Sequence, residues 1–518
     1  MLAGVDDADA EPDAAVSEPV AVADAGDGPE AGSDALDGAP SPAAATEDGT
    51  GSDGGVTWNR IIALLFAIVG LRVGLAPLSD NSFFTHLATG RIIVSGQGIP
   101  RVDPYSFTAQ GDPWTVQSWL ASVLYAGLED AVGLVGIRIL IGLCTMLLAL
   151  LVWRLTRPAE LLVGRLCIAV PVLAIGTTRW VERPLIFGLL FLAAVLLALE
   201  DELDPRWLVP IMWLWVNIHG SFPLGLVAIG AFGLGRLLDR ERPTLELRVA
   251  GWAALGTALG AINPLGIDLL TFPLGLLERR EAFSRIAEWQ APTWQDWGER
   301  FFAVQLLVAV VLLLWRGRSW RTAVPLVIFG LAAVTSSRNI LQASLVLVPG
   351  MAASARGLGS IDGREALAIL RPVRIALVAL LVLVAAIGLS QPDTSLSDYP
   401  TESVAWLHDR GELGIDDRVV TRDFVGNFLE AAYGPDEVRV YLDDRVDMYP
   451  IDVIADYSIL IDPEGDYGAV LERADATAVI WDKDTPFADW LADPDNGWRI
   501  AFDDEDLWVV ALPEGSSP

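Results

Sequence analysis

Lysine, histidine and cysteine are nearly missing from this sequence, which has one lysine, three histidines and two cysteines among 518 residues. Arginine therefore carries almost all of the positive charge. Both cysteines, Cys144 and Cys167, lie in apolar segments, so we expect no disulfide framework. Basic residues are also missing from residues 1–57, which contain 14 acids, while residues 392–518 contain 31 acids against 8 bases. Such acidic ends argue against a nucleic-acid partner.

Apolar residues, by contrast, are abundant in this sequence. Hydrophobic residues make up 53% of the chain, there are 19 tryptophans, and the mean hydropathy is +0.44. These values exceed those of soluble proteins and predict a polytopic α-helical membrane protein. We expect a disordered acidic cytoplasmic tail over 1–56, a transmembrane domain over 57–392, and an extracytoplasmic α/β domain over 393–518.

Eleven apolar segments are expected to span the lipid bilayer. They cover approximately residues 58–78, 119–153 (one span preceded by an amphipathic stretch), 161–177, 185–200, 205–217, 222–238, 248–262, 301–316, 321–335, 340–356 and 373–391. Arginine is concentrated in four of the connecting loops, which eleven spans place on the same side of the membrane. The positive-inside rule makes that side cytoplasmic. We therefore predict a multi-pass protein of the cell membrane with a cytoplasmic N-terminus.

The first external loop, 79–118, is unusually rich in ionisable groups. It begins SDNSFFTHLATGRIIVSGQGIPRVDPYSFT, with Asp80 directly at the membrane exit. The pattern predicts a helix to about Val94 that lies in the interface on Phe83, Leu87 and Val94. Asp80 and His86 either belong to a functional site, or Asp80 caps this helix and His86 reaches the interface. Asp103 either binds a ligand or forms an Asx turn.

The other external clusters face the same compartment in this topology, which makes one shared site a hypothesis. Each cluster has a simpler explanation: a local ion pair, a hydrogen-bonded histidine or a helix end. The residues concerned are Arg179, Glu182, Arg183, His219, Glu288 and Arg338, together with the helix-breaking pair Asn263–Pro264. Arginine's planar fork matches phosphate oxygens, so the arginines are candidates for a phosphate site.

The C-terminal domain is predicted to contain strands at VRVYL (438–442), ATAVIW (476–481) and LWVVAL (507–512). Helices are predicted at TESVAWLHDRG and FADWLAD. It contains no Gly-rich phosphate loop and no metal-ligand spacing. Its string YLDDRVDMY either binds sugar hydroxyls or forms a solvated, salt-bridged turn.

The first-loop string resembles the first external loop of GT-C-like membrane proteins, the polytopic glycosyltransferases of bacteria and archaea and their relatives. The resemblance continues in ERPLIFGLLF, WLWVNIHGSFPLG, INPLG, EWQAP, SSRNI and YLDDRVDMY, and so covers about residues 58–515. This chain departs from the pattern at Ser82, Phe84 and Thr85, where relatives show a second acid and paired tryptophans.

The resemblance implies a GT-C-like fold that transfers a sugar from a polyprenyl-phosphate donor to an envelope glycan, lipid or protein on the extracytoplasmic face. Asp80 occupies the position of the general base. Groups that hold the donor or its phosphate are then sought among the remaining candidates on that face: His86, Arg91, Asp103, Arg179, Glu182, Arg183, His219, Glu288 and Arg338. A divalent metal is neither indicated nor excluded. A non-catalytic scaffold and a transporter or flippase of lipid-linked glycans are the alternatives.

Overall fold

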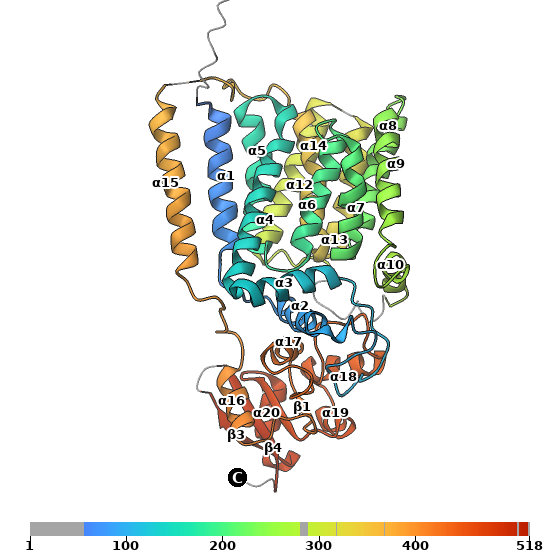
Figure 1. Cartoon of the computed structure of the whole chain (residues 1–518), viewed down its shortest axis with the longest axis vertical. Helices are drawn as coiled ribbons and strands as arrows, with labels where there is room; N and C mark the ends of the chain where they lie inside the picture. Colours follow the sequence, from blue (N-terminus) through green and yellow to red (C-terminus); the bar gives the residue numbers. More distant parts are fainter. Residues whose placement is uncertain (1–55, 280–288, 318, 367, 505–506, 516–518) are drawn as a thin grey trace, which may run out of the picture. The chain divides into compact units, whose positions relative to one another are not determined.

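The structure, a computed structural model, describes residues 56–279, 289–317, 319–366, 368–504 and 507–515. The predicted disordered tail, 1–56, lies outside these ranges except for Val56. The described chain is mostly helical, with a small sheet near its C-terminus (Figure 1). Four described helices are long and apolar enough to cross a membrane: Leu134–Ala159, Leu162–Arg179, Trp297–Arg316 and Leu370–Leu389.

Each of the eleven apolar segments coincides with a helix. These are α1 (Trp58–Gly74), α4 (Leu134–Leu155), α5 (Leu162–Arg179), α6 (Leu185–Leu199), α7 (Leu208–Ile218), α8 (Pro223–Leu238), α9 (Thr244–Leu259), α12 (Trp297–Arg316), α13 (Trp320–Thr335), α14 (Ile340–Ser354) and α15 (Leu370–Leu389). The amphipathic beginning of segment 119–153 forms a helix of its own, α3 (Trp119–Val132). It ends at Gly133, which has a φ of +79°. Glycine adopts this conformation readily, and because it is not helical it separates α3 from α4.

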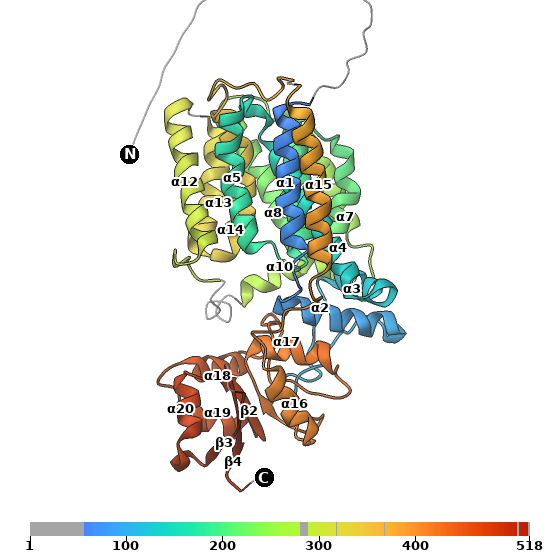
Figure 2. The ribbon, with the colours of Figure 1, turned by 90° about the vertical axis from the view of Figure 1, so that its left-hand side faces the viewer.

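Small residues allow α1 to approach α4 closely. A Cβ atom on Gly70 would lie 2.6 Å from the Thr145 carbonyl oxygen, and one on Gly74 would lie 2.3 Å from the Thr145 hydroxyl. Small residues at helix interfaces favour association in membranes because backbones can come close. On its other side α1 packs against α15, and the two helices lie side by side in Figures 1 and 2.

Arg138 of α4 is fully buried and ties the ends of α1 and α15 together. Its guanidinium donates to the carbonyls of Leu75 (2.8 Å) and Gly388 (2.5 Å) and pairs with Asp393 at 3.0 Å. The last carbonyls of a helix have no partner within the helix and carry partial negative charge. One cation therefore satisfies the C-terminal ends of two helices.

Replacing Arg138 with Leu should lower the stability of the helical bundle. The substitution leaves buried carbonyls without donors, and a buried acceptor left unpaired costs about 1–3 kcal/mol. We expect a loss of about 3 kcal/mol or more, visible as a lower Tm in detergent. The matched control is Arg72→Leu, since Arg72 is exposed on α1 and should tolerate the change. Equal melting of both variants would contradict the structural role of Arg138.

The four arginine-rich loops meet at one end of the helices. Their contacts include Arg154–Glu202 (2.7 Å), Arg157–Glu202 (3.0 Å), Arg321–Glu200 (2.9 Å), Arg236–Glu246 (2.7 Å), and a hydrogen bond from Arg316 to the carbonyl of Arg356 (2.7 Å). The first external loop, by contrast, contacts the segments that follow α7 and α9. Its Gln117 side chain accepts from the amide of Gly220 at 2.7 Å, and Arg101 donates to the carbonyl of Pro264 at 2.6 Å.

The C-terminal domain combines a four-stranded mixed sheet with five helices. Its elements are α16 (Thr401–Asp409), β1 (Val419–Val420), α17 (Asp423–Ala432), α18 (Ile451–Ile461), α19 (Tyr467–Ala474), β2 (Ala478–Asp482), α20 (Pro486–Ala492), β3 (Trp498–Asp503) and β4 (Trp508–Pro513). The strand order is β1-β2-β4-β3, with β1 parallel to β2 and the other pairs antiparallel. Two predicted strands and both predicted helices are present.

The predicted strand at VRVYL is wrong, and the reason is a contact with the first external loop. Val440 does not join the sheet. Its amide donates to the carbonyl of Tyr105 at 3.0 Å, and its carbonyl accepts from the amide of Phe107 at 3.0 Å. The backbone of this β-forming segment is therefore paired with a loop more than 300 positions earlier in the chain, which local sequence patterns do not reveal.

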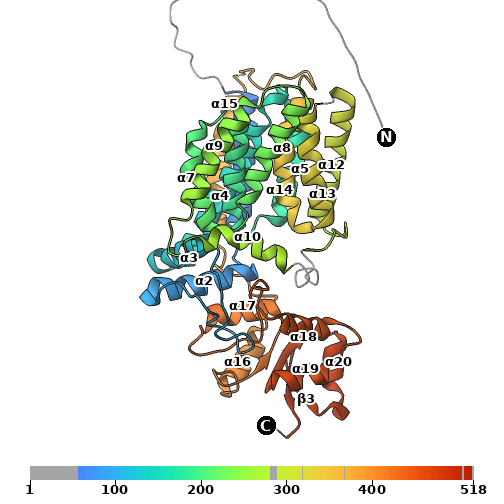
Figure 3. The same ribbon diagram turned by 90° about the vertical axis from the view of Figure 1, so that its right-hand side faces the viewer.

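The first external loop begins with α2 (Asn81–Ile92), which packs against α3 on one side and α17 on the other (Figure 3). Phe83, Phe84 and Leu87 are buried, whereas Val94 is exposed beyond the end of the helix. The predicted helix is therefore present, but it is covered on two sides rather than lying on one apolar face. This packing joins the loop to the C-terminal domain.

Candidate functional site

Asp80 and Arg183 form the centre of the candidate site. Asp80 occupies the N-cap position of α2 but makes no capping bond with its side chain. Arg183, in the turn between α5 and α6, directs its Nε at both carboxylate oxygens, at 2.8 and 2.7 Å. The Asp80 side chain is only 10% exposed and that of Arg183 28%. The Asp80 carboxylate therefore does not cap α2. It forms an ion pair with Arg183 instead.

Glu182, next to Arg183, binds the backbone of Asp80 and of the residue before it. One of its carboxylate oxygens accepts from the amides of Ser79 (2.5 Å) and Asp80 (2.8 Å). The carbonyl of Glu182 in turn accepts from the buried hydroxyl of Tyr125 at 2.8 Å. The sequence predicts that Glu182 binds substrate. In the structure its carboxylate binds the backbone amides of Ser79 and Asp80.

The environment of Asp80 raises its pKa to about 6. Burial is the largest cause because it penalises the charged carboxylate, and the negative charges of Glu182 and Asp444 act in the same direction. The positive charge of Arg183 opposes them and keeps the shift moderate. A carboxyl group with a pKa close to neutrality can both accept and return a proton under physiological conditions.

His86 lies on α2 and is a neutral hydrogen-bonding group rather than a cation. Burial and the positive charge of Arg183 lower its pKa to about 4. Its Nδ1 lies 3.3 Å from the hydroxyl of Ser122 on α3. Any positive charge that the site offers to a phosphate must therefore come from arginine.

His219 and Arg338 approach the same region from two other elements. His219 directly follows α7, and its Nδ1 lies 2.8 Å from the hydroxyl of Ser221. Burial and the positive charge of Arg338 lower the pKa of His219 to about 3. The guanidinium of Arg338 lies over the Trp289 ring, 4.9 Å from its centroid. The structure therefore pairs Asp80 with Arg183 directly, while His86 and His219 are connected to arginine only by electrostatic effects, and one shared site stays a prediction.

Two other predicted residues, Arg91 and Arg179, have partners outside the Asp80–Arg183 pair. Arg91 pairs with both carboxylate oxygens of Glu129 (2.7 and 2.6 Å) and donates to the carbonyl of Ala431 at 2.5 Å. Arg179 pairs with Asp296, and its Nη2 lies 3.5 Å from Glu299. The last predicted residue, Glu288, lies outside the described residues.

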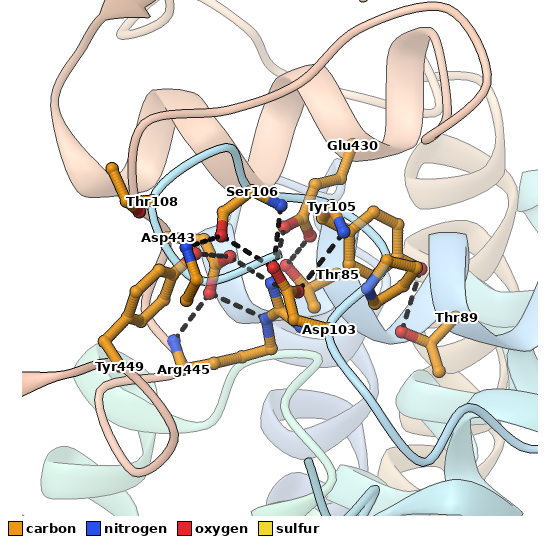
Figure 4. Close-up of polar contacts among 12 residues, drawn as sticks. Thr85, Thr89, Asp103, Tyr105, Ser106, Thr108, Glu430, Asp443, Arg445 and Tyr449 are labelled. Atoms are coloured by element: carbon orange, nitrogen blue, oxygen red, sulfur yellow. Dashed lines mark hydrogen bonds and ion pairs between the residues drawn. The ribbon is translucent and has the colours of Figure 1, made fainter. Parts of the chain in front are cut away.

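Asp103 is 2% exposed and both forms a local turn and binds an arginine of the C-terminal domain. It accepts from the amide (2.9 Å) and hydroxyl (2.6 Å) of Ser106 and pairs with Arg445 at 2.7 Å. Arg445 also pairs with Asp443 at 2.5 Å and lies 3.4 Å from Glu430 (Figure 4). The string YLDDRVDMY is thus a buried ion-pair cluster and not the solvated turn that was one of its two interpretations.

The acids around Asp80 do not fit a metal site. In the described part of the chain, no three His, Cys, Asp or Glu side chains are grouped so that they could hold an ion. Asp80 faces the guanidinium of Arg183, while Glu182 accepts two amide hydrogens and Asp444 accepts side-chain donors. A hard divalent cation needs several such oxygens unshared with other cations and donors. We therefore assign no step to a metal.

Comparison of the sequence with models of protein families and with curated proteins finds no match. Among solved structures, the chain is similar to the oligosaccharyltransferase AglB of Archaeoglobus fulgidus in complex with an inhibitory peptide and a dolichol-phosphate. The identity is 13%, 89% of this chain and 75% of that chain are covered, and the TM-score is 0.47. A second structure of the Archaeoglobus fulgidus oligosaccharyltransferase, tethered to an acceptor peptide, shares 14% identity over 82% and 69% of the two chains, with a TM-score of 0.47. A third, in complex with zinc and sulfate, shares 13% identity over 81% of this chain and 68% of that chain, with a TM-score of 0.43. The chain thus shows a distant structural similarity to an archaeal membrane glycosyltransferase, at TM-scores too low to assign it a family.

Proposed function

We propose that the protein is a membrane glycosyltransferase that moves a sugar from a polyprenyl-phosphate donor to a glycan, lipid or protein acceptor of the cell envelope. The observation that carries the proposal is the pairing of a partly buried carboxyl, Asp80, with Arg183. The proposal takes His86, His219 and Arg338 as further hydrogen-bonding and cationic groups of this site, because Arg183 lowers the pKa of His86 and Arg338 lowers that of His219. The likeness of the first external loop to GT-C-like proteins supports the same activity.

In this mechanism Asp80 is the general base. Its carboxylate takes the proton of the acceptor as the acceptor atom forms a bond to the anomeric carbon of the donor sugar. The bond from that carbon to the phosphate oxygen breaks, and the phosphate leaves on its lipid with the bonding electrons. Arg183 and Arg338 stabilise the negative charge that develops on the leaving phosphate.

In this mechanism the Asp80 carboxylate and the donor phosphate compete for the guanidinium of Arg183. In the structure its Nε binds Asp80 and its Nη2 donates to Asn81 at 3.1 Å. A guanidinium binds either oxyanion through its planar fork. Donor binding that draws Arg183 towards the phosphate would weaken its bond to Asp80 and leave that carboxylate a stronger base.

We place this site on the extracytoplasmic side, with eleven spans and the N-terminus in the cytoplasm. The arginine-rich loops that meet at one end of the helices support this orientation through the positive-inside rule. The C-terminal domain, which packs on α2 through α17, is then extracytoplasmic as well.

Reconstituted protein tests the proposal against its two alternatives. Proteoliposomes are supplied with a polyprenyl-phosphate donor labelled in the sugar and with an envelope-lipid or peptide acceptor. The proposal predicts label in the acceptor and one polyprenyl phosphate released for each sugar transferred. Movement of intact donor across the bilayer would instead indicate a flippase, and saturable donor binding without product would indicate a scaffold. Either of these results would contradict the proposal.

The pH dependence of transfer should report the ionisation of Asp80. A base must be deprotonated to act, so kcat/KM should rise with pH through about 6 and level off above it. Because the pKa of Asp80 is raised above that of an ordinary aspartate, the loss of activity on acidification begins near neutrality rather than near pH 4. A profile that stays flat down to pH 4.5 would exclude Asp80 as the base.

A further inference from the structure

Asp444 of the C-terminal domain lies against the first turn of α2, although 362 positions separate it from Ser82. The Ser82 hydroxyl donates to Asp444 Oδ2, and the Asn81 side-chain amide lies 3.4 Å from the same oxygen. The other carboxylate oxygen, Oδ1, accepts from the Asn427 side chain at 2.6 Å. The side chain of Asp444 thus has donors from both the first external loop and α17.

Asn81 connects Asp444 to the centre of the candidate site. Its side-chain oxygen accepts from Arg183 Nη2 at 3.1 Å, while its side-chain nitrogen faces Asp444. Arg183 in turn holds Asp80 through Nε at 2.7 Å. A closed series of contacts therefore runs from Asp444 through Asn81 and Arg183 to Asp80, the residue that directly precedes Asn81 in the chain.

Asn427 of α17 holds this arrangement from the side of the C-terminal domain. Its side-chain nitrogen lies 2.6 Å from Asp444 Oδ1 and also 2.6 Å from the hydroxyl of Thr85, one turn further along α2. Thr85 donates to Glu430 of α17 at 2.5 Å. Two successive turns of α2 are therefore bound to α17 by buried or partly buried polar contacts, which keep one geometry because misplacing any of them leaves groups unpaired.

We propose that Asp444 is a positioning residue of the Asp80 site, supplied by the C-terminal domain. Its carboxylate fixes the first turn of α2 and thereby sets the place of Asp80 against Arg183. The C-terminal domain is then part of the site rather than an appendage to the helical domain. The expected effect of Asp444 on catalysis rests on the proposed role of Asp80 as the base. The expected effect of Asp444 on the position of α2 does not.

Electrostatics gives the proposal a second consequence. The charged groups that face Asp80 are Arg183, Glu182 and Asp444, from the α5–α6 turn and the C-terminal domain. Asp444 acts on Asp80 as a negative charge, which favours the protonated form. Removing that charge while keeping the side-chain shape should lower the pKa of Asp80, so the acid limb of the transfer profile should move to lower pH.

Three variants separate positioning from general stability. Asp444→Asn keeps the shape and removes the charge, Asp444→Ala removes the contacts, and Asp416→Asn is the matched control, an exposed acid of the same domain. We expect Asp444→Ala to lower kcat about 10- to 100-fold with little change in the KM for donor. Asp444→Asn should retain more of kcat and move the acid limb down by roughly half a pH unit. Asp416→Asn should match the wild type in kcat and in the position of the acid limb.

Hydrogen exchange of α2 tests the structural part without any catalytic assay. Amides of peptides that cover Asn81–Ala88 should exchange faster in Asp444→Ala than in wild type, Asp444→Asn or Asp416→Asn, while α14 stays protected in all four. If the wild type transfers no sugar but this exchange pattern is found, the proposed function fails and the positioning contact stands. If α2 exchange and the pH profile of Asp444→Ala and Asp444→Asn both match the Asp416→Asn control, the inference is overturned.

Discussion

Replacing Asp80 with Asn should reduce sugar transfer by about 10²- to 10⁴-fold, the range by which a positioned general base accelerates a reaction. Asparagine has nearly the same shape, but it cannot take the acceptor proton at neutral pH. Because Asn is uncharged, Arg183 also loses its carboxylate partner at 2.7 Å and becomes available to the donor phosphate. We therefore expect the loss in kcat, with donor affinity unchanged or increased.

The control for this variant is Asp130→Asn. Asp130 is an exposed acid on α3, and α3 packs directly against α2. It should retain wild-type transfer and wild-type membrane insertion. Wild-type turnover in Asp80→Asn would remove Asp80 from the mechanism, and a loss of donor binding without a loss in kcat would make Asp80 a binding group instead.

Replacing Arg445 with Met should produce the largest loss of stability in the C-terminal domain. Arg445 is 6% exposed and lies between the carboxylates of Asp103 and Asp443, with its guanidinium 4.4 Å from the centroid of the Trp114 ring. Methionine fills similar volume but leaves these acids buried without a cation. Removing one partner of a buried ion pair costs about 3–5 kcal/mol.

Unfolding of the purified protein in denaturant, followed by the fluorescence of its tryptophans, measures this loss. The matched control is Arg473→Gln, which removes an ion pair with Asp456 in which the arginine side chain is 51% exposed. An exposed pair contributes about 0–1 kcal/mol, so this variant should differ little from wild type. A triple variant, R445M with D103N and D443N, should recover much of the loss because the unpaired charges are gone. Equal stability of R445M and the control would contradict the role of the buried cluster.

The apolar segments were sufficient to predict the helices of the bundle, whereas α10 (Asp268–Glu278) and the C-terminal helices α17, α18 and α19 were not predicted. All eleven apolar segments coincide with helices, and the division between α3 and α4 follows the change in amphipathicity before Gly133. These features are local, since a helix satisfies its backbone within one stretch of sequence. Strand β1 was missed because it has only two residues, and β3 because it is partly exposed and lacks the continuous buried apolar run of β2 and β4. The segment 438–442 was misassigned because its partner is a distant loop.

The sequence indicated Asp80, Arg183, His86, His219 and Arg338 from charge, topology and resemblance, and the structure pairs the first two directly. That all five share one site stays a prediction. Their roles remain predictions. What could not be foreseen is the contribution of the C-terminal domain, because it consists of contacts between residues more than 300 positions apart. Ser82 and Thr85, two departures from the family pattern, are the residues whose hydroxyls donate to Asp444 and Glu430.

The central claim is that this region binds a lipid-linked sugar phosphate with its reacting carbon beside Asp80. The most direct measurement is an experimental structure of the protein in lipid nanodiscs with a non-transferable phosphonate analogue of a polyprenyl-phosphate sugar. We predict the phosphonate in contact with Arg183 or Arg338, and space for an acceptor atom within about 3 Å of the Asp80 carboxylate. A donor headgroup bound among the arginine-rich loops at the other end of the helices would contradict the account.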